Sequence, residues 1–200
     1  MAISVESLVN QALRRASYKI EIGSIYEGTT AARAALTLYG QTRDDLIRMK
    51  DWDFARQDAT LVLLKTAPVG GYGLMPWTSA YPLGSWIYEY AYPTACLKIR
   101  SIRPTPIIIP VLDPQPVTFA IADDPSVSPA KVVLTNLANA QAVYSGQITD
   151  MTQWEATFTE AFIEALARRL GEALGANADA VKTQLQIEAA TIAEADTVRG

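Results

Sequence analysis

The segment Trp86-Ile87-Tyr88-Glu89-Tyr90-Ala91-Tyr92 alternates aromatic residues with other residue types, which is the period of a β-strand. Aromatic side chains at that spacing usually pack one face of a sheet. All eleven prolines of the 200-residue chain lie around this segment, between Pro68 and Pro129. Because prolines in sheets favour edge strands and loops, the sequence predicts a turn-rich β region here rather than a large regular sheet.

Several short runs near this segment also have the composition of strands. Leu97-Lys98-Ile99-Arg100 alternates apolar and basic residues, as a strand with one solvated face does. The other candidate strands are residues 60–64, 107–109, 117–121 and 131–134. We expect the β region to close at Gly146.

The rest of the chain carries apolar residues at helical spacing and contains no proline in residues 1–67 and 130–200. The expected helices span about 4–17, 29–51 and 150–175, with a fourth from Asn177 onward. Asp150 is expected to cap the third helix, and Gly175 to end it in the left-handed conformation. Gly40, inside the second helix, predicts a close helix crossing.

These elements predict an α+β fold, in which a four-helix bundle formed by the N- and C-terminal segments is interrupted by a small β-rich domain. The helical domain is assigned to residues 1–59 and 148–200, and the β-rich insertion to residues 60–147. A chain of 200 residues can bury such a core without disulfides or metal ions.

The residue content excludes several kinds of chemistry. The chain has no histidine and a single cysteine, Cys96, so it offers neither an internal disulfide nor a Cys/His metal site. Serine nucleophiles lack a histidine to activate them, and Gly70-Gly71-Tyr72-Gly73 lacks the lysine of a phosphate loop. Asp44 and Asp45 are adjacent on a helix and are interpreted as a solvated face. We therefore expect no enzyme, with no catalytic residues, cofactor or metal ion.

The charge distribution argues against tight wrapping of nucleic acid, because the chain has a net charge of −4. Residues 150–200 carry nine acidic and four basic residues and are the most acidic part. Lys98, Arg100 and Arg103 could form a basic strand face. No aromatic residue is interleaved among them, so this patch is weak, and a subunit interface explains it as well.

No targeting segment is expected from the sequence. Its start, Met1-Ala2-Ile3-Ser4, lacks the basic and apolar regions of a signal peptide, and no run of about 18 apolar residues occurs. We expect a soluble protein made in the cytoplasm, with no membrane partner.

Four blocks of residues, in this order along the chain, carry a resemblance to a known family. They are Tyr39-x-x-x-Arg43-Asp44-x-Leu46, Trp52-Asp53-Phe54-Ala55, Tyr92-Pro93-Thr94-Ala95-Cys96-Leu97-Lys98-Ile99 and Asp150-Met151-Thr152-Gln153-Trp154-x-x-x-Phe158. Over nearly its whole length the sequence resembles the tail tubular protein A-like head-to-tail adaptors of short-tailed bacteriophages. The Trp-x-Phe-Ala block is the best single marker. The sequence departs from the family at Ala95, where the family usually has an acidic residue.

The resemblance implies a structural virion protein at the head-to-tail junction, made in the host cytoplasm. Typically twelve copies form an adaptor ring that docks on the portal protein, connects it to the tail nozzle or other tail proteins, and lets double-stranded DNA pass through its lumen. The resemblance assigns the C-terminal helices to portal docking and the β-rich region to neighbouring subunits or the nozzle. The interface or family-motif candidates are Arg43, Trp52, Phe54, Tyr92, Pro93, Trp154 and Phe158.

Three alternatives stay open. A head-completion connector of a long-tailed phage would be a protein of the same structural class. A nucleic-acid-binding accessory protein would show salt-dependent affinity for DNA. An enzyme would need a cluster of ionisable groups with perturbed pKa values, and no motif in the sequence indicates one.

Overall fold

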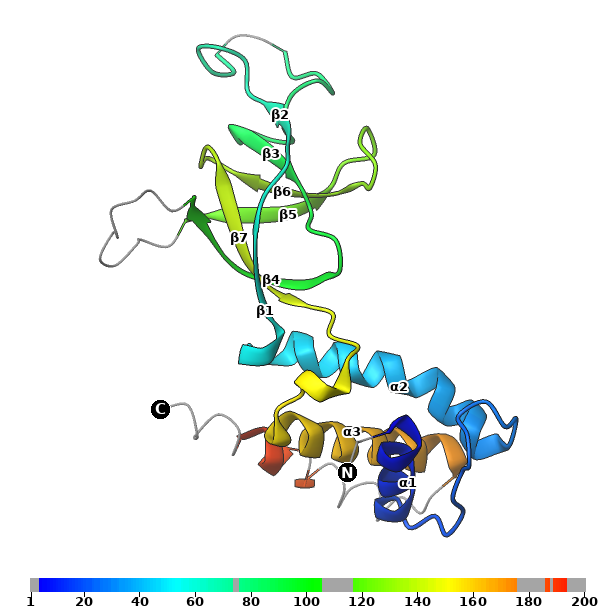
Figure 1. Cartoon of the computed structure of the whole chain (residues 1–200). Coiled ribbons are helices and arrows are strands. Elements are labelled where there is room, and N and C mark those ends of the chain that lie inside the picture. The colour runs from blue at the N-terminus through cyan, green and yellow to red at the C-terminus, as the bar shows by residue number, and fades with distance from the viewer. Residues whose placement is uncertain (1–3, 74–75, 106–116, 176–185, 188, 194–200) are drawn as a thin grey trace. The chain divides into compact units, whose positions relative to one another are not determined.

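The computed structural model describes residues 4–73, 76–105, 117–175, 186–187 and 189–193 (Figure 1). The chain divides into two compact units. The helical unit comprises Met1–Phe54 and Ile148–Gly200, and the β-rich unit comprises Ala55–Gln147. The sequence predicts these boundaries after residues 59 and 147.

Three long helices form the framework of the helical unit. They are α1 (Val5–Arg15), α2 (Thr30–Met49) and α3 (Ala156–Leu174), accompanied by the short 3-10 helices η1 (Asp53–Ala55) and η2 (Met151–Gln153). Hydroxyl side chains cap the first two helices. Ser4 Oγ accepts the Ser7 N–H at 3.1 Å, and Thr29 Oγ1 accepts the Ala32 N–H at 3.2 Å. These caps satisfy donors that a helix N-terminus otherwise leaves without partners.

Different features determine where α3 begins and where it ends. Asp150 caps η2 rather than the long helix, because its carboxylate accepts the Thr152 N–H at 2.9 Å. α3 itself begins only after Glu155, whose backbone is extended. At the other end Gly175 has a φ of 77°, the left-handed conformation that glycine adopts at low cost, as the sequence predicts.

α3 is the central element of the helical unit. It packs against both α1 and α2, and it runs alongside α2 (Figure 1). Its large buried side chains are Phe158, Phe162, Ile163, Leu166 and Leu170. Because these residues lie on several sides of the helix, α3 needs neighbours on more than one side.

The β-rich unit contains seven strands in its described residues. They are β1 (Arg56–Thr60), β2 (Leu63–Thr66), β3 (Tyr88–Ala91), β4 (Cys96–Pro104), β5 (Phe119–Asp123), β6 (Lys131–Thr135) and β7 (Ala140–Gly146). They form two antiparallel sheets, with the strand orders β1-β7-β4 and β2-β3-β6-β5. One apolar core serves both sheets, since Tyr90 and Val133 of the second sheet pack in the same cluster as Ile99, Ile102 and Tyr144 of the first.

The predicted four-helix bundle with an inserted domain is wrong. The protein is a mixed α/β protein that contains two antiparallel sheets as well as helices. The prediction fails at the expected fourth helix. Residues 186–187 and 189–193 are helical but are exposed or half-buried, so they do not supply the apolar stripe that a bundle helix must bury. The start of that helix at Asn177 and the candidate strand at 107–109 lie outside the described residues.

Candidate functional site

The family-motif residues of the helical unit meet in one aromatic cluster. Trp52, Phe54 and Trp154 each contact the ring of Phe158, at centroid distances of 5.1, 4.8 and 5.0 Å. Phe158 is fully buried and Trp52 is 1% exposed. Two blocks that are far apart in the sequence are therefore halves of one core, and aromatic pairs of this kind stabilise packing beyond their buried area.

The polar atoms of this cluster also have partners. Trp52 Nε1 donates to the Leu46 carbonyl at 3.0 Å, and Trp154 Nε1 donates to the Ile148 carbonyl at 3.3 Å. Burial raises the pKa of Tyr39, which stacks at the edge of the cluster, to about 12. The tyrosine hydroxyl thus stays protonated at neutral pH, and the cluster has the character of a structural core.

Arg43 is engaged within its own helix. It is 9% exposed, and its Nε donates to Asp44 Oδ1 at 2.8 Å. The cation that lies over the Trp52 ring is Lys50, with Nζ 4.8 Å from the centroid. The structure therefore gives Arg43 a local ion pair, and its role in a subunit contact stays a prediction.

Tyr92 and Pro93 lie in the β-rich unit, separate from the aromatic cluster. They follow β3 and line a pocket of about 300 Å³, which opens where β1 ends and β2 begins, beside Leu61 and Val62. Lys131 Nζ stands 4.2 Å from the centre of the Tyr92 ring. The described residues that line this pocket are uncharged, so it is suited to an apolar group.

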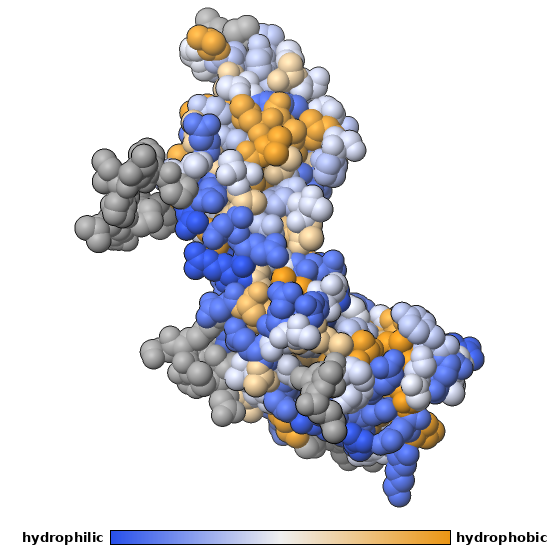
Figure 2. Space-filling model, in the orientation of Figure 1, coloured by the Kyte–Doolittle hydropathy of each residue, from blue (hydrophilic) through white to orange (hydrophobic). Residues whose placement is uncertain are grey.

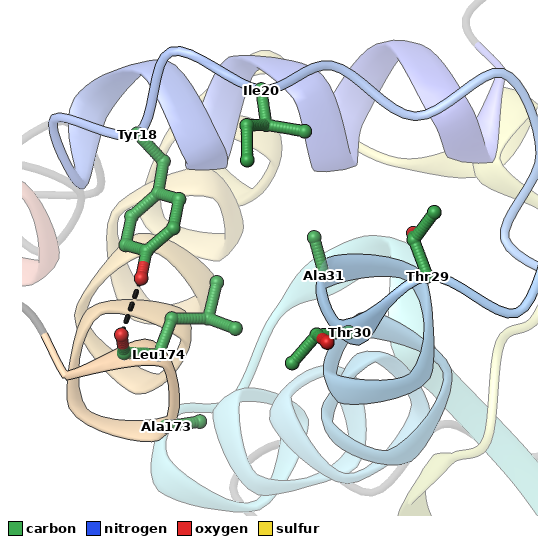
Figure 3. Close-up of a pocket in the computed structure, with 7 residues that line it drawn as sticks. All are labelled: Tyr18, Ile20, Thr29, Thr30, Ala31, Ala173 and Leu174. Carbon is green, nitrogen blue, oxygen red and sulfur yellow. Dashed lines mark hydrogen bonds between the residues drawn. The ribbon is translucent and has the colours of Figure 1, made fainter.

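A second pocket, of about 390 Å³, lies in the helical unit (Figure 3). Its lining comes from the segment after α1, the start of α2 and the end of α3: Tyr18, Ile20, Thr29, Thr30, Ala31, Ala173 and Leu174. The Tyr18 hydroxyl points toward the end of α3 and donates to the Leu174 carbonyl. The described residues that line this pocket are uncharged as well.

A buried cluster of ionisable side chains, Lys65, Glu89 and Asp124, joins three segments of the β-rich unit. Lys65 on β2 donates to the Asp124 carboxylate and, at 2.8 Å, to Ser126 Oγ. Glu89 on β3 is fully buried, and its Oε2 accepts the Leu83 N–H at 3.1 Å. Its Oε1 lies 3.5 Å from Lys65 Nζ, beyond good hydrogen-bond length.

The pKa values of this cluster follow from burial and proximity. Burial raises the pKa of the Glu89 carboxyl. The hydrogen bond from Lys65 holds the pKa of Asp124 well below its usual range. Burial alone lowers the pKa of Lys65, but the hydrogen bond and charge of Asp124 outweigh it, so that the pKa is raised. None of the three residues is among those that line the two pockets. The cluster therefore has a structural role, in which it connects β2 and β3 to the loop that follows β5.

Sequence reasoning missed this cluster because its members lie on separate elements and belong to no motif. A faint signal was present: Glu89 interrupts an aromatic strand at a position where an apolar residue would be expected in a sheet buried on both faces. Its pairing with Lys65 depends on the register between β2 and β3, in which the two residues are opposite.

Exposed apolar side chains gather near β2, which is an edge strand. Val62 is 67% exposed, Leu63 is 50% exposed and Leu64 is 38% exposed. Figure 2 shows apolar surface over β2 and β3 in the β-rich unit. Ile87, just before β3, adds a further exposed side chain. We call these four residues the β2 apolar patch.

The described residues contain no group of three or more acidic, cysteine or histidine side chains that could hold a metal ion. Burial raises the pKa of the half-buried Cys96 thiol, which disfavours the reactive thiolate. Among the helices that the structure describes, none has the length and apolar character needed to cross a membrane.

Comparisons of the sequence with protein-family models and with curated proteins found no match.

Proposed function

We propose that this protein is a structural subunit of a head-to-tail adaptor ring in a short-tailed bacteriophage. In this role it docks on the portal, connects it to the tail nozzle and leaves a lumen for double-stranded DNA. The observation that carries the proposal is the β2 apolar patch, because an exposed run of large apolar side chains at a sheet edge is typical of a surface that another chain covers.

The ion pairs of the helical unit support a scaffold rather than a catalyst. Arg15 bridges α1 to α3 through Glu160 at 2.7 Å and through Glu164. Arg169 on α3 reaches Asp45 on α2 at 2.8 Å. These pairs connect α1 and α2 to α3, and because most of their side chains are partly exposed, each adds at most about 1 kcal/mol to the apolar packing.

The ring form of the proposed assembly is inferred from the resemblance of the four sequence blocks to the adaptor family. The aromatic residues of three of the four blocks pack on one another in the helical unit, so these three blocks share one core, whereas the block that begins at Tyr92 lies in the β-rich unit. Heterologous contacts between identical subunits close into a ring when their rotation permits. The β2 apolar patch and the pocket beside Tyr92 and Pro93 are the surfaces of the β-rich unit suited to such a contact.

Electron microscopy of the tagged protein, isolated from the cells that produce it together with its large partners, tests the proposal. We expect rings of high cyclic symmetry stacked on a second ring. A protein that stays monomeric and carries no ring-shaped partner would contradict it, and would favour the accessory-protein alternative.

A pair of variants links the ring to the patch. Leu63→Lys with Leu64→Lys is expected to abolish ring formation without lowering the melting temperature of the free chain, since both side chains are exposed. Met49→Lys with Ile20→Lys changes two apolar residues of the helical unit that are exposed by 64% and 56%, more than Leu63 and Leu64, and serves as the control. Rings that survive the first change and not the second would move the interface to the helical unit.

A further inference from the structure

The two edge strands of the four-stranded sheet run in opposite directions. In the order β2-β3-β6-β5, β2 and β5 are outermost, and no strand of the described residues pairs with the outer side of either one (Figure 1). Each neighbouring pair in this sheet is antiparallel, so three antiparallel steps separate β2 from β5. The outer side of an edge strand is a template on which a strand of another chain can pair.

One row of apolar side chains crosses this sheet from edge to edge. Leu63 of β2 lies opposite Tyr90 of β3. Val133 of β6 lies opposite Tyr90 on one side and opposite Ile121 of β5 on the other. Because residues directly opposite each other share a face, the row lies on the face that carries the core, to which Tyr90 and Val133 belong.

The row is buried in its middle and exposed at both ends. Tyr90 is 2% exposed and Val133 is fully buried. Leu63 at one end is 50% exposed, and Ile121 at the other is 44% exposed. Each edge of the sheet therefore presents an aliphatic side chain that continues the core row outward.

We infer that β5 of one copy of this chain pairs with β2 of the next copy, so that Ile121 of the first extends the apolar row at Leu63 of the second. Two copies in the same orientation bring these strands together as an antiparallel pair, because β2 and β5 run in opposite directions. The contact joins two different surfaces, so it can repeat from copy to copy. The inference rests on the proposed function and names the surface that covers the β2 apolar patch.

The regularity of the two edges favours β5 over a second β2 as the partner. β5 pairs with β6 without a register shift from Phe119 to Asp123, so its backbone offers a regular edge. β2 has a register shift between Leu63 and Lys65, and two such edges would fit each other poorly. A contact between two copies of β2 would also leave Ile121 uncovered, whereas pairing of β2 with β5 covers both ends of the row.

Cross-linking of the full-length chain in the cells that produce it tests the inference. The variant is Leu63→Cys with Ile121→Cys, and a short bismaleimide joins thiols that lie close together. We expect a ladder of covalent oligomers on a denaturing gel, because every junction brings the two substituted positions together. Each single cysteine variant should give no ladder, and the wild-type chain controls for its one native thiol, that of Cys96.

Charge variants of the same two positions test the contact in a second way. Ile121→Lys should abolish assembly as Leu63→Lys does, because either change places a charge at the junction. Ile121→Lys with Leu63→Glu in one chain places opposite charges there and should restore assembly. Val69→Lys changes a fully exposed aliphatic residue outside both edge strands and should have no effect.

Mass photometry of the isolated material measures assembly in these charge variants, and melting curves of the isolated chains check their folding. The melting temperatures should not fall, because Leu63, Ile121 and Val69 are all exposed in the single chain. Assembly that survives Ile121→Lys would overturn the inference. Failure of the opposite-charge variant to assemble, with its melting temperature unchanged, would also count against it.

The outcomes separate this inference from the proposed function. Rings without cross-links in the double cysteine variant contradict only the inference, and covalent dimers from Leu63→Cys alone replace it with a contact between two copies of β2. A ladder from open chains of copies supports the contact and contradicts only the ring, because the rotation between copies decides whether the contact closes. A chain that stays monomeric and gives no cross-links contradicts both.

Discussion

Phe158 of α3 lies edge-on against Trp52, with ring centroids 5.1 Å apart and ring planes at 82°. The contact joins the segment that follows α2 to the first turn of α3, so the two separate stretches of the helical unit meet in one core. Edge-to-face pairs of this kind add to the stabilisation that burial provides. The helical unit therefore depends on residues that sequence reasoning assigned to an interface or family motif.

Phe158→Ala should lower the free energy of unfolding by about 3 to 5 kcal/mol, because it removes a fully buried ring and leaves a cavity against three aromatic neighbours. Urea titration followed by tryptophan fluorescence measures this. Trp77→Ala, which truncates a half-exposed ring of the β-rich unit, should cost much less. Equal losses in the two variants would mean that the cluster does not dominate the stability of the helical unit.

Asp124→Asn should destabilise the protein at pH 7 by about 3 kcal/mol, because it leaves the buried Lys65 ammonium without its closest counter-charge. The pKa of Asp124 is depressed by Lys65, so its contribution is present above the ordinary aspartate pKa and is lost as the pH falls through the depressed value. The gap between wild type and variant should therefore narrow in acid. Urea midpoints at several pH values between about 2 and 7 measure it, and a gap independent of pH would rule this account out.

Glu89→Gln should have the opposite pH dependence. Burial raises the pKa of Glu89, so ionising this carboxyl costs stability as the pH rises from the ordinary glutamate range through the raised value. Glutamine mimics the protonated form and can still accept the Leu83 N–H. We expect the variant to equal wild type in stability near pH 4 and to exceed it above neutral pH. Melting curves across this range test the sign, and a variant less stable at high pH would contradict it.

Gly175→Ala and Gly40→Ala form a matched pair with opposite expected signs. Gly175 has a φ of 77°, so alanine there should cost about 1 kcal/mol through backbone strain. Gly40 lies inside α2 with ordinary helical φ, and a methyl group there would meet no atom within 4 Å. Alanine at Gly40 should therefore stabilise the helix by about 0.5 to 1 kcal/mol.

Chemical denaturation of both glycine variants measures the two effects under the same conditions. If Gly40→Ala proved destabilising, α2 would have a close neighbour that the single chain does not contain, such as another subunit. Among the residues that the structure describes, none lies within 4 Å of a Cβ placed at Gly40, so these residues do not form the close helix crossing predicted there.

The expected strands agree with the structure where β-branched, aromatic or large apolar residues dominate the run, and β6 was predicted in this way although four of its five residues are buried. The run 131–134 corresponds to β6, and the alternating aromatic segment contains β3. β7 was not predicted from the sequence. It is the central strand of its sheet, and six of its seven residues are buried. A strand buried on both faces loses the alternation on which sequence reasoning depends. Its small residues, such as Ala140 and Gly146, added no strand signal.

The sequence by itself determined the features that arise within a few residues: the caps at Ser4 and Thr29, the glycine end of α3 and the confinement of prolines to the β-rich region. These depend on backbone sterics and local hydrogen bonds, which neighbouring residues specify. The tertiary structure alone decided the rest. Two sheets share one core, and Lys65 meets Glu89 and Asp124. Each of these depends on strand register, which brings together residues that no local spacing relates.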